Sequence, residues 1–431
     1  MSRRRFASCS SEPNARHYGW LGPLYIVMAL CTGSCATTAP TSAVEFSSAE
    51  RELLLTLSPL PPPPRDETNA VDGNSEAIAF GAALFFDKRL SGNGDVSCGT
   101  CHDPAKAWTD GRSLPQAQGT GIRNTLSIWN AAYQRWLFWD GRADSLWSQA
   151  LHPIEDPLEM NSTRLQVAHV IASDPSLAAQ YKNLFGEAPS FEDSQRFPTR
   201  GGPRAHDVDA QLNWWQMQSS DREQVNRVFV NLGKAIAAFE ATIVTTEAPF
   251  DRFVADLRAG RPSNALSASA QRGLKLFIGR GNCAVCHSGP TFSNLEFHDI
   301  RVPALNEQMP PDMGRARGIA ELSADEFVSA GYFSDQPAGT RAQHLAFLDA
   351  EAAVLGHFKT PGLRNVALTA PYMHQGQMAT LREVVEYYSK LDTAVAPADP
   401  NHIEALIVEL DLTEREIDDL VAFLESLSSD P

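Results

Sequence analysis

The chain has 431 residues, of which 43% are hydrophobic and 20% are charged, and its formal net charge at pH 7 is −16. This length and apolar content suffice for two hydrophobic cores of ordinary domain size. The acidic excess argues against a nucleic-acid partner. It is compatible with a basic redox partner, attracted over a Debye length of about 8–10 Å, and equally with an acidic surface that serves only solubility.

The first residues have the features of an export signal. Three arginines at positions 3–5 precede an apolar run at residues 20–30 that is too short to span a bilayer, and the small residues Gly33, Ser34 and Ala36 suit a cleavage site. We therefore expect residues 1–36 to be an export signal and the mature chain to be periplasmic. A lipid anchor at Cys35 is the less favoured alternative, because the aliphatic residue usual before such a cysteine is missing.

Residues 37–70 are expected to form a proline-rich tether. Pro59 and the prolines at 61–64 favour extended polyproline geometry, and a packed helix cannot contain such a run. Beyond the tether, we expect an N-terminal domain at residues 71–250 and a C-terminal domain at residues 251–431.

The most informative stretches are two copies of the pattern C-x-x-C-H. They consist of Cys98, Cys101 and His102, and of Cys283, Cys286 and His287. In this pattern two thiols add across the vinyl groups of a haem, and the imidazole becomes an axial ligand of the iron. Structural zinc sites and redox dithiols also use paired cysteines, but zinc ribbons bring their pairs within roughly 15–20 residues. We therefore predict two covalently bound c-type haems, with His102 and His287 on the iron atoms.

A degenerate internal repeat surrounds the two motifs. Residues 81–85 resemble 273–277, residues 121–124 resemble 362–365, and residues 141–146 resemble 376–381. Self-similarity of this kind predicts two related haem domains in tandem.

The secondary structure is expected to be mainly helical. A stripe of apolar residues at helical spacing runs through residues 225–244. Thr380 with Glu383, and Thr413 with Glu416, have the spacing of capping boxes, which mark helix starts. No sustained alternation of apolar and polar residues is present, so a substantial sheet is not expected. The predicted fold class is mainly α, with two tandem cytochrome c-like haem domains.

From about residue 80 to residue 389 the chain resembles the bacterial dihaem cytochrome c peroxidase family, which includes MauG-like members. The matching stretches are Leu-Ser-Gly-Asn-Gly at 90–94, Phe-Trp-Asp-Gly-Arg-Ala at 138–143 and Ala-Pro-Tyr-Met-His at 370–374. The resemblance implies that the haem of the first motif reacts with hydrogen peroxide. It also implies that the haem of the second motif transfers electrons.

The resemblance assigns roles to three residues near the first haem. Glu159 matches the family's distal acid/base, which moves a proton between the oxygens of bound peroxide. Gln149 matches its companion, and Trp139 matches the aromatic residue between the haems. From the residues alone, a surface acid is the favoured interpretation of Glu159. The aromatic cluster that contains Trp139 is ordinarily part of a core, which is compatible with a position between the haems.

A calcium ion between the haems is also implied by the resemblance. Asn124 matches its side-chain ligand, and Thr369 and Pro371 match two backbone carbonyl donors. Oxygen donors suit this hard cation.

One departure from the family pattern concerns the first haem. Many members close it with a distal histidine, and the corresponding position here is Gln116. Because glutamine is a poor ligand of iron, we expect the first haem to be open even when fully oxidised. His152 is a possible substitute ligand, although a structural role for it is favoured.

A second departure concerns the second haem. The family's usual distal methionine aligns with Tyr388, as in MauG-like members, and a phenolate ligand stabilises higher oxidation states. The alternative is that Tyr388 is a core residue and that Met373 or Met378 is the ligand. MauG carries a tryptophan on the route to its partner where this chain has Gly281, so a different substrate is expected.

Three functions remain open at this point. The first is a peroxidase that takes electrons from a small periplasmic cytochrome or copper protein. The second is a MauG-like enzyme that uses peroxide to oxidise a partner protein, and the third is a non-catalytic electron-transfer cytochrome. A homodimer is possible, since dimers are common in this family.

Overall fold

A computed structural model describes residues 44–306, 308–348, 354–391 and 406–429. The expected export signal and Cys35 lie outside these residues. Residues Ala43–Pro431 form one unit, and within it the elements divide between two hydrophobic cores, one around each C-x-x-C-H motif.

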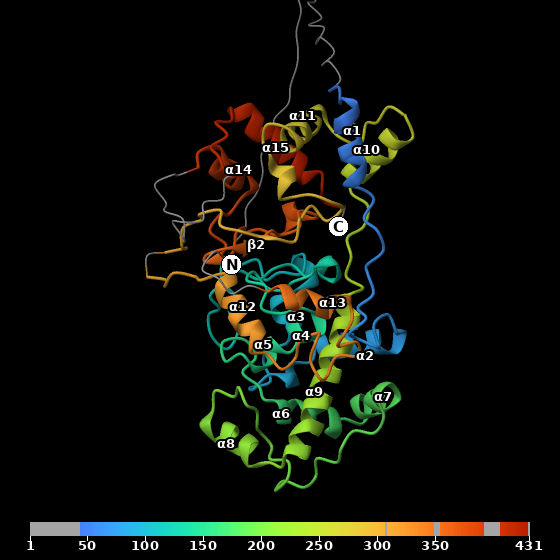
Figure 1. Cartoon of the computed structure of the whole chain (residues 1–431), viewed down its shortest axis with the longest axis vertical. Helices are drawn as coiled ribbons and strands as arrows, with labels where there is room; N and C mark the ends of the chain where they lie inside the picture. Colours follow the sequence, from blue (N-terminus) through green and yellow to red (C-terminus); the bar gives the residue numbers. More distant parts are fainter. Residues whose placement is uncertain (1–43, 307, 349–353, 392–405, 430–431) are drawn as a thin grey trace, which may run out of the picture. The chain divides into compact units, whose positions relative to one another are not determined.

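The elements up to residue 240 include a long central helix, α9, which runs through the lower part of Figure 1. The helices are α1 Ser48–Thr56, α2 Ser75–Phe85, α3 Cys98–Cys101, α4 Leu146–Gln149, α5 His152–Glu155, α6 Arg164–Ser173, α7 Pro175–Phe185, α8 Val208–Gln216 and α9 Ser219–Glu240. Short 3-10 turns are η1 Lys88–Leu90, η2 Pro104–Lys106 and η3 Ala131–Tyr133.

The remaining elements surround the second motif. The helices are α10 Pro249–Arg258, α11 Ala268–Ile278, α12 Arg315–Ser323, α13 Thr340–Gln343, α14 Leu381–Ser389 and α15 Glu414–Glu425. The 3-10 turns are η4 Cys283–Val285, η5 His344–Phe347 and η7 Val366–Leu368, and the two-residue strands β1 Phe297–His298 and β2 Phe358–Lys359 pair antiparallel. Because these are the only strands among the described residues, the expectation of a mainly helical chain is confirmed.

Each core is built on one close helix crossing. In the first core α2 packs on α9, and in the second α11 packs on α15. A Cβ atom at Gly81 would lie 1.9 Å from the carbonyl oxygen of Ala235, and one at Gly273 would lie 1.8 Å from that of Asp419. Only glycine allows both contacts, so the sequence repeat corresponds to a repeated packing geometry.

Both predicted capping boxes are confirmed. Thr380 is the N-cap of α14 and Thr413 that of α15, and each hydroxyl accepts from the backbone N–H three residues later while the glutamate there caps in return. Helix α9 begins at Ser219 and ends at Glu240, so it starts before the expected apolar stripe and ends earlier than that stripe.

The segment expected to be an extended tether differs from that expectation. Helix α1 lies inside it, started by a capping box between Ser47 and Glu50. Leu54 and Leu57 are fully buried in the second core. The expectation applied the effect of the proline run to residues that precede it. From residue 58 to residue 66 the chain is indeed non-helical.

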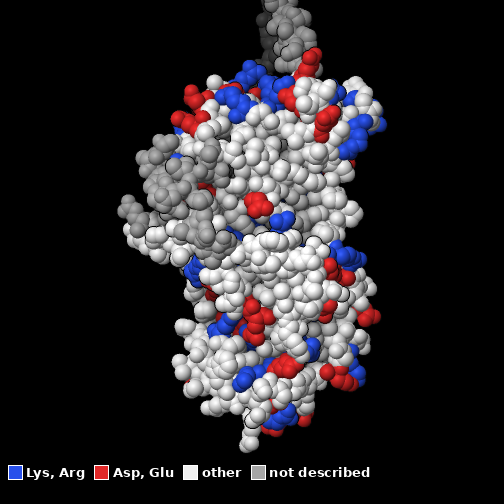
Figure 2. Space-filling view, in the orientation of Figure 1, with Lys and Arg blue, Asp and Glu red and all other residues white. Residues whose placement is uncertain are grey.

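The surface carries charges of both signs. On the face shown in Figure 2, acidic and basic side chains are interspersed rather than gathered into one field. Within the described residues, no helix combines the length and the apolar character needed to cross a membrane.

Candidate active-site cavity

One cavity of about 760 Å³ is lined by residues of both motifs. Cys101 and His102 reach it from the first half, and Cys283, Cys286 and His287 reach it from the second. Cys98 packs against the first core beside it, and all four motif cysteines are free of disulfides. The described residues contain no cluster of His, Cys, Asp and Glu side chains that could hold a metal ion directly. Paired thiols beside an imidazole on an apolar wall fit haem rather than zinc.

The two histidines are oriented in the same way. His102 Nδ1 lies 3.1 Å from the carbonyl oxygen of Trp108, and His287 Nδ1 lies 2.9 Å from that of Phe292. Burial lowers the pKa of both imidazoles, which favours the neutral ring. A carbonyl that accepts from Nδ1–H leaves the Nε2 lone pair available for iron, as a proximal ligand requires.

Glu159 and Gln149 line the cavity on the side of the first motif. Gln149 is the last residue of α4, and the turn that follows α5 carries Glu159. Burial, together with the nearby charge of Asp156, raises the pKa of Glu159 to about 7. A carboxyl group with this pKa can both accept and release a proton near neutral pH.

His152 lines the same cavity but is engaged elsewhere. Its Nε2 lies 3.0 Å from Asp325 Oδ2, and Arg204 contacts the other side of that carboxylate at 3.3 Å. The pKa of Asp325 is held far below its usual range, against the effect of burial, by His152 and Arg204. The imidazole also packs edge-on against Phe138 at 5.5 Å between ring centroids. These contacts agree with the structural role favoured from the sequence.

Gln116 lies outside the cavity. Its side chain is exposed, and its Oε1 accepts a hydrogen bond of 3.1 Å from the Thr120 hydroxyl. The neighbouring residues Pro115 and Ala117 do line the cavity. The glutamine therefore faces solvent at the position where a distal histidine was considered.

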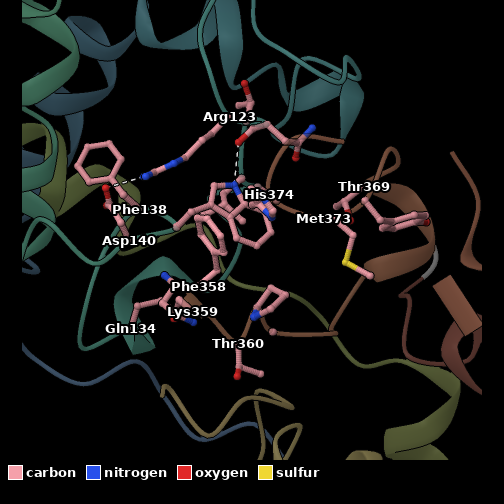
Figure 3. A pocket seen from close by; sticks show the side chains of 18 of the residues that line it. Arg123, Gln134, Phe138, Asp140, Phe358, Lys359, Thr360, Thr369, Met373 and His374 are labelled. Atoms are coloured by element: carbon pink, nitrogen blue, oxygen red, sulfur yellow. Dashed lines mark hydrogen bonds and ion pairs between the residues drawn. The ribbon is translucent and has the colours of Figure 1, made fainter. Parts of the chain in front are cut away.

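Trp139 lines the cavity that residues of both motifs share. Its Nε1 donates to the Asn124 carbonyl at 2.9 Å, and its ring centroid lies 6.5 Å from that of His374. His374 in turn stacks on Phe358, with centroids 3.9 Å apart, in the centre of Figure 3. Trp139 is only 8% exposed, which agrees with its interpretation as part of an aromatic core.

Charged groups around this aromatic cluster were not identified from the sequence. Arg123 pairs with both Asp140 and Asp312, and Figure 3 shows the first contact. Lys359 is buried, its Nζ donates to the Trp136 carbonyl at 2.9 Å, and burial lowers its pKa to about 7. Nothing in the local sequence separates this lysine from a surface one, because its burial depends on contacts across more than 200 residues.

On the side of the second motif, Tyr388 and Met373 both line the cavity. Burial, with the nearby thiols of Cys283 and Cys286, raises the pKa of the Tyr388 hydroxyl. Met378 is absent from the lining and pairs with Tyr372 across a short turn. Of the three residues considered as the distal ligand of the second haem, Tyr388 and Met373 therefore line the cavity and Met378 does not.

The three residues matched to a calcium site all line the cavity: Asn124, Thr369 and Pro371. Asn124 Nδ2 donates to the Arg112 carbonyl at 2.7 Å, which turns the amide oxygen away from that contact. The donor set is made of neutral oxygens, which a hard cation accepts.

Gly281 lines the cavity just before the second motif. A Cβ atom there would lie 2.8 Å from the Leu276 carbonyl oxygen. The local backbone therefore has no room for a tryptophan side chain without a shift.

Comparison with known proteins identifies the family. The family model described as di-haem cytochrome c peroxidase matches residues 75–259. The methylamine utilization protein MauG of Methylorubrum extorquens is 32% identical over 405 residues, covering 93% of this chain and 90% of that protein. The chain belongs to the di-haem cytochrome c peroxidase and MauG family. It is therefore a di-haem oxidoreductase, as the sequence predicted.

Other members of the di-haem peroxidase family match along most of their length. The cytochrome c551 peroxidase of Pseudomonas aeruginosa is 30% identical over 340 residues, 77% of each chain. A crystal structure of a MauG-like protein associated with microbial copper homeostasis matches with a TM-score of 0.58 and 26% identity, over 86% of this chain and 94% of that one. The diheme peroxidase BthA of Burkholderia thailandensis, at 24% identity and a TM-score of 0.61, supports the fold.

Proposed function

We propose that this protein is a periplasmic enzyme with two tandem c-type haem domains that reduces hydrogen peroxide at the N-terminal haem and receives electrons through the C-terminal haem. Cys98, Cys101 and His102 would hold the first haem, and Cys283, Cys286 and His287 the second. A haem held there would supply an iron centre that binds peroxide and accepts electrons. The observation that carries the proposal is the single cavity that both motifs share with Glu159.

Glu159 takes up the first proton of hydrogen peroxide and returns it to the oxygen that leaves as water. Its pKa of about 7 suits both steps at neutral pH, since neither protonation state is strongly disfavoured. Gln149 orients the peroxide through its side-chain amide. A protein that only carried electrons would have no use for a half-buried carboxyl group in the cavity that both motifs line, which disfavours the third function.

The first site is accessible to peroxide without prior reduction. Gln116 faces solvent, and the His152 Nε2 is engaged by Asp325. The two side chains considered as distal ligands of the first haem are therefore not available to bind its iron. This supports a resting enzyme that reacts in its fully oxidised form.

Trp139 provides the route between the two halves. Its ring lies against His374, and its indole N–H fixes it to the carbonyl of Asn124. A calcium ion held by Asn124, Thr369 and Pro371 would sit beside this contact and stiffen it. The electron donor is a small periplasmic cytochrome or copper protein.

A second candidate function is MauG-like oxidation of a partner protein. The observation that favours it is Tyr388, which lies in the wall near Cys283 and Cys286 and is the tyrosine that the resemblance matched. A phenolate ligand stabilises higher oxidation states at the second haem. Because Gly281 replaces the tryptophan of the MauG route, the partner would differ from that of MauG.

The first experiment adds stoichiometric hydrogen peroxide to the fully oxidised protein and follows haem absorption. An immediate change is expected. If the reaction begins only after one electron is supplied, the first haem is closed at rest; recovery of the immediate reaction in His152→Ala would then identify the closing ligand.

A steady-state assay separates the two candidate functions. Sustained consumption of peroxide with a reduced small cytochrome or copper protein supports the peroxidase. Failure with every such donor, together with oxidation of a partner protein, would replace it by the MauG-like function.

A further inference from the structure

A cluster of aromatic rings lies behind the proximal histidine of the first motif. The Phe85 centroid is 6.4 Å from that of His102 and 6.1 Å from that of Trp108. Phe239 closes the cluster, 5.3 Å from Phe85 and 6.3 Å from Trp108. Trp108 is also connected to His102 directly, because its carbonyl oxygen lies 3.1 Å from the imidazole Nδ1.

The second half provides an internal comparison. There the carbonyl of Phe292 lies beside His287 Nδ1 at 2.9 Å, and Phe292 has the same positive φ as Trp108, 54° against 60°. Phe292 is fully buried among phenylalanine rings. A phenylalanine is therefore sufficient to hold the proximal histidine, and the indole of Trp108 is not needed for that task.

Two properties distinguish Trp108 from Phe292. The indole ring loses an electron far more readily than a phenyl ring. In addition, Trp108 is partly exposed whereas Phe292 is 0% exposed. The first half thus places an oxidisable side chain between its proximal histidine and the solvent, where the second half has an inert and buried one.

We propose that Trp108 is a site of peroxide-dependent oxidation, through which oxidising equivalents leave the N-terminal half at the proximal surface when no donor supplies electrons. This inference rests on the proposed reaction of peroxide at the first motif. It gives the protein a second outlet, separate from the route through Trp139 to the second half.

The chemistry balances without a further reagent. One molecule of hydrogen peroxide takes up two electrons and two protons and leaves as two molecules of water. The indole of Trp108 supplies both electrons, and one of its ring C–H bonds becomes C–O–H with an oxygen atom from water and the release of two protons. The indole is oxidised by two electrons, and the peroxide is reduced by the same two.

The test treats the fully oxidised holoprotein with small additions of hydrogen peroxide in the absence of a donor, measures peroxide consumption and locates added oxygen by peptide mass spectrometry. We expect the peptide of Trp108 to gain one oxygen atom. The matched control is Trp215, which is 62% exposed and lies on α8, away from both motifs. We expect Trp215 to stay unmodified, because exposure alone does not direct the reaction.

Two variants sharpen the result. Trp108→Phe introduces the residue that the second half uses and should lose the modification. Glu159→Gln should lose it together with the reaction of peroxide. If Trp108→Phe does not fold, the positions of added oxygen in the unaltered protein still test the inference.

Each contrary outcome has one meaning. Peroxide consumption with Trp108 unmodified, or with Trp215 modified to the same extent, overturns this inference and leaves the proposed function standing. Absence of peroxide consumption by the unaltered protein overturns the proposed function, and the inference with it.

Discussion

The substitution Glu159→Gln tests the acid/base role of the carboxyl group in the cavity. Burial, with the charge of Asp156, raises the pKa of Glu159 from its ordinary value of 4.5 to about 7. At about 1.4 kcal/mol per pKa unit, the cavity disfavours the carboxylate by about 3 kcal/mol. A general base must be deprotonated, so the active fraction rises from about one tenth at pH 6 to about nine tenths at pH 8.

The rate constant for hydrogen peroxide with the oxidised protein should therefore rise about tenfold between pH 6 and pH 8. Glutamine keeps the size of Glu159 but cannot take up a proton, so Glu159→Gln should slow the reaction by about 100- to 10,000-fold and abolish the pH dependence. Stopped-flow absorption of the haems measures both effects. A variant that retains the pH profile, or that slows the reaction by less than about threefold, would refute the assigned role.

Asp156→Asn is the matched control for Glu159→Gln. It removes the charge that raises the pKa of Glu159, while an asparagine oxygen can still accept the hydrogen bond that Leu158 N–H donates at 2.8 Å. We expect the midpoint of the pH profile to move to lower pH and the plateau rate at high pH to stay unchanged. An unmoved midpoint would mean that the rate does not report the ionisation of Glu159.

Three further substitutions test the rest of the proposed architecture. Trp139→Phe removes the indole and its hydrogen bond to Asn124; it should slow the spectral response of the second haem to peroxide by about tenfold, and an unchanged response in stopped-flow absorption would exclude this route. Tyr388→Met should raise the reduction potential of the second haem by a sizeable part of the roughly 0.8 V that axial ligands span, whereas Met373→Leu should leave it unchanged; redox titration showing the reverse would make Met373 the ligand. Gly273→Ala should lower the thermal unfolding temperature, because the added Cβ would lie 1.8 Å from the carbonyl oxygen of Asp419. This clash costs about 3 kcal/mol, which outweighs the usual gain from alanine in a helix, and Gly81→Ala should have the same effect. A higher unfolding temperature in either variant would contradict the crossing geometry.

Local features of the fold were predictable because their causes are local. A threonine followed three residues later by a glutamate satisfies two helix N–H groups wherever it occurs, and both boxes start helices as expected. The repeat around Gly81 and Gly273 was recognisable from sequence similarity. Its physical cause, a helix crossing with no space for a Cβ atom, is seen only in the structure.

The misjudged tether shows a limit of composition. The prolines from Pro59 onward keep their own segment non-helical, but they exert no influence on Ser48–Thr56. That helix exists because Leu54 and Leu57 find a core built from residues around 250–427. The capping box of Ser47 and Glu50 within the segment marks the start of the helix, but nothing within the segment indicates the distant core that buries its leucines.

The candidate site divides in the same way. Residues carried by motifs, such as His102, Glu159 and Trp139, converge on one cavity. The outward direction of Gln116 and the burial of Lys359 depend on side-chain packing that spacing does not encode. The sequence therefore identifies the candidate site residues well, but it does not show which of their side chains face the cavity.

The internal repeat also explains how one fold supports two different roles. In both halves a backbone carbonyl oxygen lies beside Nδ1 of the proximal histidine. Both halves also contain the same close helix crossing at a glycine. They differ in what surrounds that common frame: a carboxyl group and a partly exposed indole in the first half, and a half-buried phenol and buried phenylalanines in the second. In the proposed function, Glu159 would act as the proton donor beside the first haem and Tyr388 as a ligand of the second, which suits peroxide reduction in one half and electron transfer in the other. On this proposal, the functional asymmetry arises from a few side chains on two similar helix crossings.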